Sequence, residues 1–80
     1  MNTNDAVARR INKLLREQKI TKYRLEQNAG MTHGALDRIL GGLNKTVTLA
    51  TLYKLARGFN MTIFEFLDDD LFRSEELEFD

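Results

Sequence analysis

Three side chains that suit hydrogen bonding to base edges lie close together near the middle of the chain, those of His33, Asp37 and Arg38, and Gly34 lies among them. Arginine can donate two hydrogen bonds to O6 and N7 of guanine, histidine can donate or accept, and aspartate can accept from N4 of cytosine. Glycine adds no side chain but allows close approach of the backbone. Two structural roles remain open for Asp37, as an i,i+4 partner of His33 or as a neighbour that supports Arg38.

Two short helices separated by a turn are predicted to position these residues. Thr21 and Thr32 can each cap a helix N-terminus, and Gly30 tolerates the left-handed conformation in which the first of the two helices ends. The inner positions of both helices are apolar: Leu25, Ala29, Met31, Leu36, Ile39 and Leu40. A second helix over about residues 32–40 with a polar outer face is typical of the helix-turn-helix unit that enters the DNA major groove.

Three further helices are predicted around this unit. Asn4 or Asp5 can cap a first helix that runs to about Gln18 and buries Val7, Ile11, Leu14 and Leu15. Thr48 can cap a fourth helix that ends near Asn60, with its inward positions at Leu49, Leu52, Leu55, Ala56 and Phe59. Thr62 and Glu65 form a capping box for a fifth helix, in which Phe64 or Phe66, with Leu67, closes the core. The chain is therefore predicted to be all-α.

The length and composition indicate one small domain. Eighty residues allow a single core, and the absence of cysteine excludes a disulfide framework and a thiolate metal site. The polar N-terminus lacks the apolar run of a signal peptide, and no window reaches the roughly 18 apolar residues of a membrane span. We expect a soluble, cytoplasmic protein.

The charge is divided unevenly along the chain, although the total is zero. Residues 1–64 carry eleven Lys and Arg against four Asp and Glu, a net charge of +7, whereas residues 65–80 carry one Arg against eight acids, a net charge of −7. A basic body favours nucleic acid as a partner. We therefore expect a helix-turn-helix domain over residues 1–70 and an acidic tail over residues 71–80.

The tail allows three interpretations. It can be a solvated end that keeps the protein soluble, or it can pair with the basic body and compete with DNA. Alternatively, its apolar residues can build a dimer contact: Leu71, Phe72, Leu77 and Phe79.

The region from Ile20 to Leu67 resembles the phage-repressor/Cro-type, or Xre-like, helix-turn-helix family. The matching features are Ile20-Thr21, Leu25, Ala29-Gly30-Met31-Thr32, Leu36, Arg38-Ile39, Gly42, Leu52-Tyr53-Lys54-Leu55-Ala56, Asn60-Met61-Thr62 and Glu65-Phe66-Leu67. The resemblance implies a compact five-helix bundle of the lambda-repressor-like type that binds double-stranded operator DNA as a homodimer and regulates transcription. It also implies that His33, Gly34, Asp37 and Arg38 face the major groove.

Five residues are expected to contact DNA phosphates: Lys22, Thr32, Asn44, Lys45 and Thr46. Thr32 is expected at a helix N-terminus, where backbone N–H groups favour phosphate. Residues 44–46 follow the reading helix in a loop that, in the family, runs beside the DNA backbone. Three cations of the first helix, Arg9, Arg10 and Lys13, are expected to give diffuse attraction only.

Three positions depart from the family pattern. Lys22 stands where the family often has Gln, and it can still contact a phosphate as a point charge. Glu26 replaces a small residue, so its carboxylate must turn outward or find a partner. Leu40 replaces a Glu that pairs with a base of the first helix, and it is expected to add apolar packing instead.

The predicted function is that of a sequence-specific transcriptional regulator without a catalytic or metal site. The alternative is a protein-interaction module, such as an antitoxin that meets a basic partner through its acidic end. An enzyme is the weakest hypothesis, because the carboxylates lie on separate helices and no nucleophile–base pair or phosphate loop is apparent.

Overall fold

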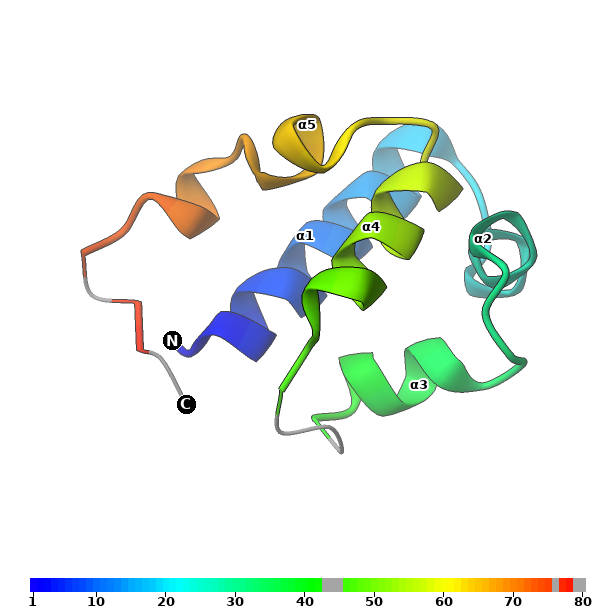
Figure 1. Ribbon diagram of the computed structural model, residues 1–80, viewed down its shortest axis with the longest axis horizontal. Helices are drawn as coiled ribbons and strands as arrows, with labels where there is room; N and C mark the ends of the chain where they lie inside the picture. Colours follow the sequence, from blue (N-terminus) through cyan, green and yellow to red (C-terminus); the bar gives the residue numbers. More distant parts are fainter. Residues whose placement is uncertain (43–45, 76, 79–80) are drawn as a thin grey trace.

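The computed structural model describes residues 1–42, 46–75 and 77–78. In these ranges the helices are α1 (Thr3–Gln18), α2 (Lys22–Ala29), α3 (Ala35–Leu40), α4 (Leu49–Gly58) and α5 (Ile63–Leu67), followed by a 3-10 turn, η1 (Asp70–Phe72). Along the long axis, α2 lies at one end of the molecule and η1 toward the other, with α1 and α4 between them (Figure 1). The predicted all-α, five-helix fold is confirmed.

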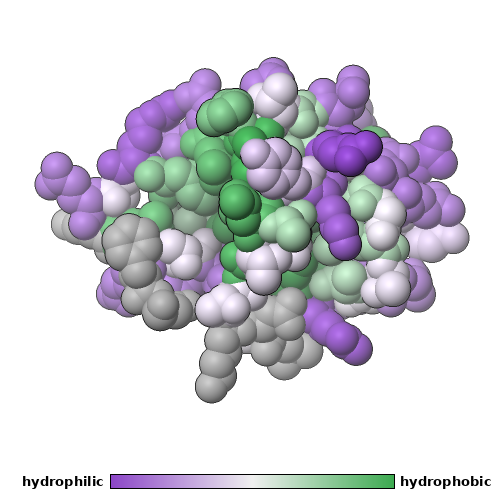
Figure 2. Space-filling view, in the orientation of Figure 1, coloured by the Kyte–Doolittle hydropathy of each residue, from purple (hydrophilic) through white to green (hydrophobic). Residues whose placement is uncertain are grey.

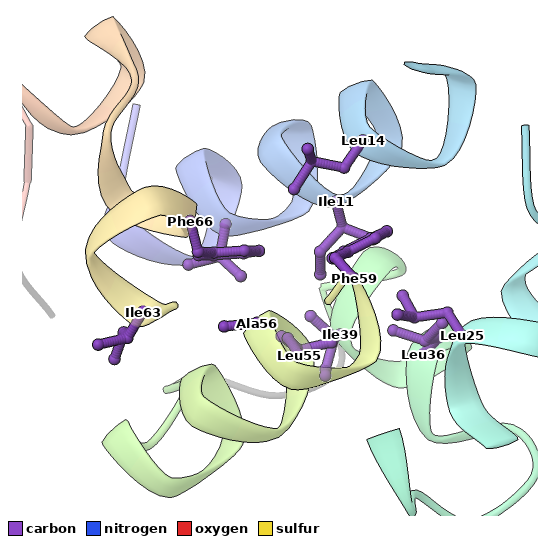
Figure 3. Close-up of a cluster of buried hydrophobic side chains, with 11 residues drawn as sticks. Ile11, Leu14, Leu25, Leu36, Ile39, Leu55, Ala56, Phe59, Ile63 and Phe66 are labelled. Atoms are coloured by element: carbon purple, nitrogen blue, oxygen red, sulfur yellow. The ribbon is translucent and has the colours of Figure 1, made fainter. Parts of the chain in front are cut away.

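One hydrophobic cluster joins all five helices. Its buried members are Val7, Ile11, Leu14, Leu25, Leu36, Ile39, Leu55, Ala56, Phe59, Ile63 and Phe66. In Figure 3, Leu25 and Leu36 lie at one end of this cluster, and Ile63 and Phe66 lie at the other. The rings of Phe59 and Phe66 stack with their centroids 6.4 Å apart. Leu40 is partly buried and packs against the cluster. This confirms the expectation that Leu40 adds apolar packing at the position where the family has a Glu.

Most of the predicted helix ends are confirmed. The hydroxyl groups of Thr21, Thr48 and Thr62 each accept from a backbone N–H three residues on, and Thr62 forms the full capping box with Glu65. The prediction for α1 was wrong, because the helix begins at Thr3 and its cap is Asn2, whose Oδ1 accepts from the Asp5 N–H at 2.8 Å. Asn4 instead lies inside the helix and is buried.

Two details of the predicted core differ in the structure. Leu49 was expected inside, but it is 63% exposed, because burial along this face of α4 decreases toward the first turn and Leu52, one turn on, is only partly buried. Of the two candidate phenylalanines on α5, Phe66 is fully buried and Phe64 is 80% exposed. Helix α5 therefore closes the core with Phe66.

Helices α2 and α4 approach each other closely at Gly58. A Cβ atom at this position would lie 2.8 Å from Cδ1 of Leu25 and 2.9 Å from Cβ of Ala29. The side-chain amide of Asn28 also donates to the carbonyl oxygen of Gly58, at 3.4 Å. The absence of a side chain at Gly58 therefore sets the separation of the two helices.

The substitution Gly58→Ala tests this contact. We expect it to lower the free energy of unfolding by about 1–3 kcal/mol, because the added methyl group overlaps α2. At an open helical position the same change would stabilise by about 1 kcal/mol through helix propensity. Urea unfolding followed by circular dichroism measures whether the free energy of unfolding falls or rises, and a stabilised variant would contradict the proposed close approach.

The acidic segment folds back onto α1. We call residues 68–75 and 77–78 the acidic strap. Leu71 and Phe72 are half-buried, and the ring of Phe72 lies 6.3 Å from that of Phe66. At the chain ends, the N–H of Thr3 donates to the carbonyl of Glu78 at 3.1 Å, and the N–H of Glu78 donates to the carbonyl of Met1 at 3.0 Å. The part of the tail that the structure describes thus packs against the domain.

Arg10 is the main polar link between α1 and the strap. It was expected to be an exposed cation, but it is buried. Its guanidinium donates to the carbonyl oxygens of Phe66 and Glu65 at 2.7 and 3.0 Å, and to Oδ2 of Asp69 at 3.2 Å. Because all three acceptors come from α5 and the strap, Arg10 serves the fold and is not available for diffuse attraction of DNA.

Asp69 completes this link. The backbone N–H of Leu71 and the ammonium of Lys13, each 2.8–2.9 Å away, hold the pKa of Asp69 below its usual value. The Asp69 side chain is 9% exposed. Its carboxylate therefore stabilises the folded state when it is ionised.

The pH dependence of stability tests Asp69. Since its pKa is lowered on folding, its contribution is present above the unfolded pKa of about 3.9 and is lost as the pH falls through the folded value. Asp69→Asn should lower the free energy of unfolding at neutral pH by about 1–3 kcal/mol and flatten its acid dependence. Asp70→Asn, a change at an exposed neighbour, should stay within about 0.5 kcal/mol. Chemical unfolding between pH 7 and acid pH measures both, and equal effects would contradict the assignment.

Candidate nucleic-acid interface

Helix α2 and the turn after it are built as predicted. Gly30 takes a left-handed φ of 69°, and the N–H of Met31 donates to the carbonyl of Glu26 at 2.9 Å. Leu25 is fully buried and anchors α2 in the core. The turn then directs the chain into α3, whose Leu36 and Ile39 are buried.

Helix α3 begins two residues later than predicted. Thr32 was expected to cap it, but the first helical residue is Ala35 and the N-cap is Gly34, which has a φ of 91° and no side chain. The carbonyl of Thr32 accepts from the N–H of Ala35 at 3.1 Å, so Thr32 closes the turn through its backbone. His33 and Gly34 therefore lie in the turn before α3, and Asp37 and Arg38 lie on the helix.

The predicted base-contacting residues lie on one continuous segment at the protein surface. The His33 side chain is 83% exposed and that of Asp37 is 72% exposed, and Arg38 is exposed as well. Arg38 lines a hollow of about 270 Å³ together with Thr46, Val47 and Thr51. Among the residues that the structure describes, Arg38 has no polar partner.

Asp37 has a partner that the sequence did not predict. Its Oδ1 lies 3.0 Å from the ammonium of Lys22 on α2, so it pairs with neither His33 nor Arg38. Both side chains of the pair are more than half exposed, and such pairs contribute less than about 1 kcal/mol to stability. Lys22, which was predicted to contact a phosphate, and Asp37, which was predicted to contact a base, thus form an ion pair between α2 and α3.

Glu26 is a residue of the interface that sequence reasoning left without a role. Its side chain is only 5% exposed, and its Oε2 accepts from the backbone N–H of Leu36 at 3.0 Å. Its Oε1 lies 3.5 Å from Nδ1 of His33. The signal in the sequence was the carboxylate at a position where the family has a small residue, and the structure supplies two partners for it.

The other phosphate candidates lie around this segment. Thr46 is exposed and lines the hollow beside Arg38. Asn44 and Lys45 lie outside the described residues. Within the described residues, no group of three or more His, Cys, Asp or Glu side chains is arranged to hold a metal ion. The helices described here include none with the length and apolar character of a membrane span.

Comparison with known families identifies this architecture. The model of the Cro/C1-type helix-turn-helix DNA-binding domain matches residues 10–70. The chain belongs to this family. Comparisons with curated proteins and with solved structures gave no match. As a Cro/C1-type domain, the protein is a DNA-binding module, with α2 and α3 as its helix-turn-helix unit.

The acidic strap of this Cro/C1-type domain lies away from α3. Figure 1 shows η1 toward one end of the long axis, and α2 with the start of α3 toward the other. The strap lies along α1, where Arg9, Lys13 and Arg16 line a cleft with it. Although the total charge is zero, the negative charge of the strap therefore lies in a different part of the molecule from α3.

The substitution Asp37→Asn distinguishes two roles for this carboxylate. If Asp37 only neutralises Lys22, its loss frees a cation, and the affinity for every DNA sequence rises a few-fold, about what one added phosphate contact gives. If it accepts from cytosine, affinity falls at one base pair only. Fluorescence anisotropy with several duplexes measures the difference. Glu75→Gln on the strap is the control for net charge and should leave DNA affinity nearly unchanged.

Proposed function

We propose that this protein is a cytoplasmic transcriptional regulator that binds a specific double-stranded operator by inserting α3 into the major groove. The observation that carries the proposal is the exposure of Arg38 on α3, without a polar partner in the described protein, on the unit that defines the Cro/C1-type family. An arginine fork that is free to meet guanine is the commonest specific contact in the major groove. His33, Gly34 and Asp37 are proposed to contact or approach the neighbouring base edges.

Phosphate contacts are proposed to set the register of α3 on the duplex. The candidates are Lys22, Thr32, Asn44, Lys45 and Thr46. Lys22 is near enough to α3 to pair with Asp37, so its ammonium lies beside the proposed reading face. Contacts of this kind give affinity to every sequence and carry little base information.

We further propose that the protein binds as a homodimer. One module of this size reads only a few base pairs, and two-fold pairing places two reading helices about 34 Å apart, one turn of DNA. Exposed apolar side chains on α4 and α5 support a protein contact: Leu49 is 63% and Phe64 is 80% exposed. Figure 2 shows hydrophobic residues gathered along the middle of the face that α4 and α5 present.

Selection of bound duplexes from a random pool tests the function directly. We expect enrichment of a short motif repeated with two-fold symmetry, which reports specificity and dimerisation together. Failure to retain any duplex at low salt would contradict the proposed function. The protein-interaction alternative would instead be supported by a basic partner that co-purifies with the protein.

Two substitutions separate base contacts from phosphate contacts. Arg38→Ala should cost about 1–3 kcal/mol of discrimination at one base pair of the selected operator. Lys22→Ala should weaken all sequences alike and lower the salt slope of log affinity by about 0.9. Arg9→Ala, on α1, serves as the control for loss of one exposed cation. If Arg38→Ala changed neither affinity nor base preference, the assignment of the reading face would be wrong.

A further inference from the structure

Helix α3 obtains its N-terminal cap from another helix. Its own N-cap, Gly34, has no side chain, and no side chain of the turn accepts from its first N–H groups. The carboxylate of Glu26, ten residues earlier on α2, accepts from the N–H of Leu36 instead. A six-residue helix is marginal by itself, so the hydrogen bond from Leu36 to Glu26 helps to hold the start of α3 in place.

The second oxygen of the same carboxylate faces His33. Oε1 of Glu26 and Nδ1 of His33 are 3.5 Å apart, and the imidazole meets the ring of Tyr23 edge-on, with centroids 5.4 Å apart. Asp37, four residues after His33, is paired with Lys22. Glu26 is therefore the carboxylate that faces the imidazole, and Tyr23 packs against the ring.

The position of Glu26 favours one of the two neutral tautomers of the His33 ring. A carboxylate oxygen can only accept, so its position near Nδ1 favours the neutral tautomer of His33 that carries its N–H on Nδ1. The other nitrogen, Nε2, is then an acceptor that a ligand can reach, because the His33 side chain is 83% exposed. In the major groove, an acceptor matches the exocyclic amino group of adenine or cytosine.

We propose that Glu26 is a positioning residue for base recognition, which caps α3 and sets the tautomer of His33 so that Nε2 accepts from the amino group of adenine or cytosine. This inference rests on the proposed function. The carboxylate need not touch DNA, since it acts through Leu36 and His33. It extends the determinants of specificity from the exposed face of α3 to a buried residue of α2.

The substitution Glu26→Gln separates the cap from the tautomer. The amide oxygen of the glutamine can still accept from the N–H of Leu36. This places its NH₂ group toward Nδ1 of His33. Nδ1 then accepts, and Nε2 becomes the N–H donor. Duplex selection at about pH 8, where a histidine ring is ordinarily neutral, should therefore move the preference at one position from adenine or cytosine toward guanine or thymine.

A duplex that lacks a single amino group provides the quantitative test. Replacing the contacted adenine by purine, or the cytosine by 2-pyrimidinone, should weaken wild-type binding by about twofold to tenfold, the effect of one hydrogen bond. The His33→Ala and Glu26→Gln variants should not respond to this replacement. Glu17→Gln, a change at an exposed glutamate of α1, is the matched control and should respond as the wild type does.

Nitrogen-15 spectra of the imidazole give a second measurement without DNA. We expect the Nδ1–H tautomer in the wild type and the Nε2–H tautomer in Glu26→Gln. An Nε2–H tautomer in the wild type, or an unchanged base preference in Glu26→Gln, would overturn the inference while leaving the proposed function intact. A wild-type protein that enriches no duplex overturns the proposed function, and with it the role of Glu26 in base recognition.

Discussion

The close approach of α2 to α4 is the constraint on which the DNA-binding unit depends. At Gly58 there is no room for a side chain between the two helices, and Leu25 of α2, which lies against this glycine, is fully buried in the core. Helix α2 buries just two residues, Leu25 and Glu26, so it has little other apolar surface by which to be held. The packing of α2 on α4 therefore helps to position the turn and α3, whose own Leu36 and Ile39 are buried in the same core.

The second constraint on this unit is the burial of the Glu26 carboxylate. Burial of a carboxylate is costly unless hydrogen bonds and charge satisfy it, and Glu26 meets this requirement with the N–H of Leu36 and the imidazole of His33. An N-terminal helix position favours negative charge, so the same contacts that satisfy Glu26 also hold the start of α3. A departure from the family pattern has thus become part of the support of the helix that is proposed to read DNA.

At the opposite end of the molecule, hydrogen bonds and opposite charge again satisfy buried ionised side chains, and there they hold the acidic strap. Arg10 satisfies carbonyl oxygens at the end of α5 and the carboxylate of Asp69, which ties the acidic strap to α1. Because the strap lies along α1, its negative charge is kept at a distance from α3 (Figure 1). A protein with zero net charge can therefore present a basic surface to DNA, since the field near a surface depends on the nearby charges and is screened over about 10 Å.

The sequence by itself determined the helices and most of their ends, because these signals are local. A threonine such as Thr21 or Thr62 caps through an N–H three residues away, and periodic apolar residues mark each buried face. Spacing along the chain does not report contacts between distant residues. Only the tertiary structure decided that Glu26 replaces Thr32 as the cap of α3, and that Arg10 is buried against residues more than fifty positions away. Their partners are brought near by the packing of α2 on α4 and of the strap on α1, and no local pattern records that packing.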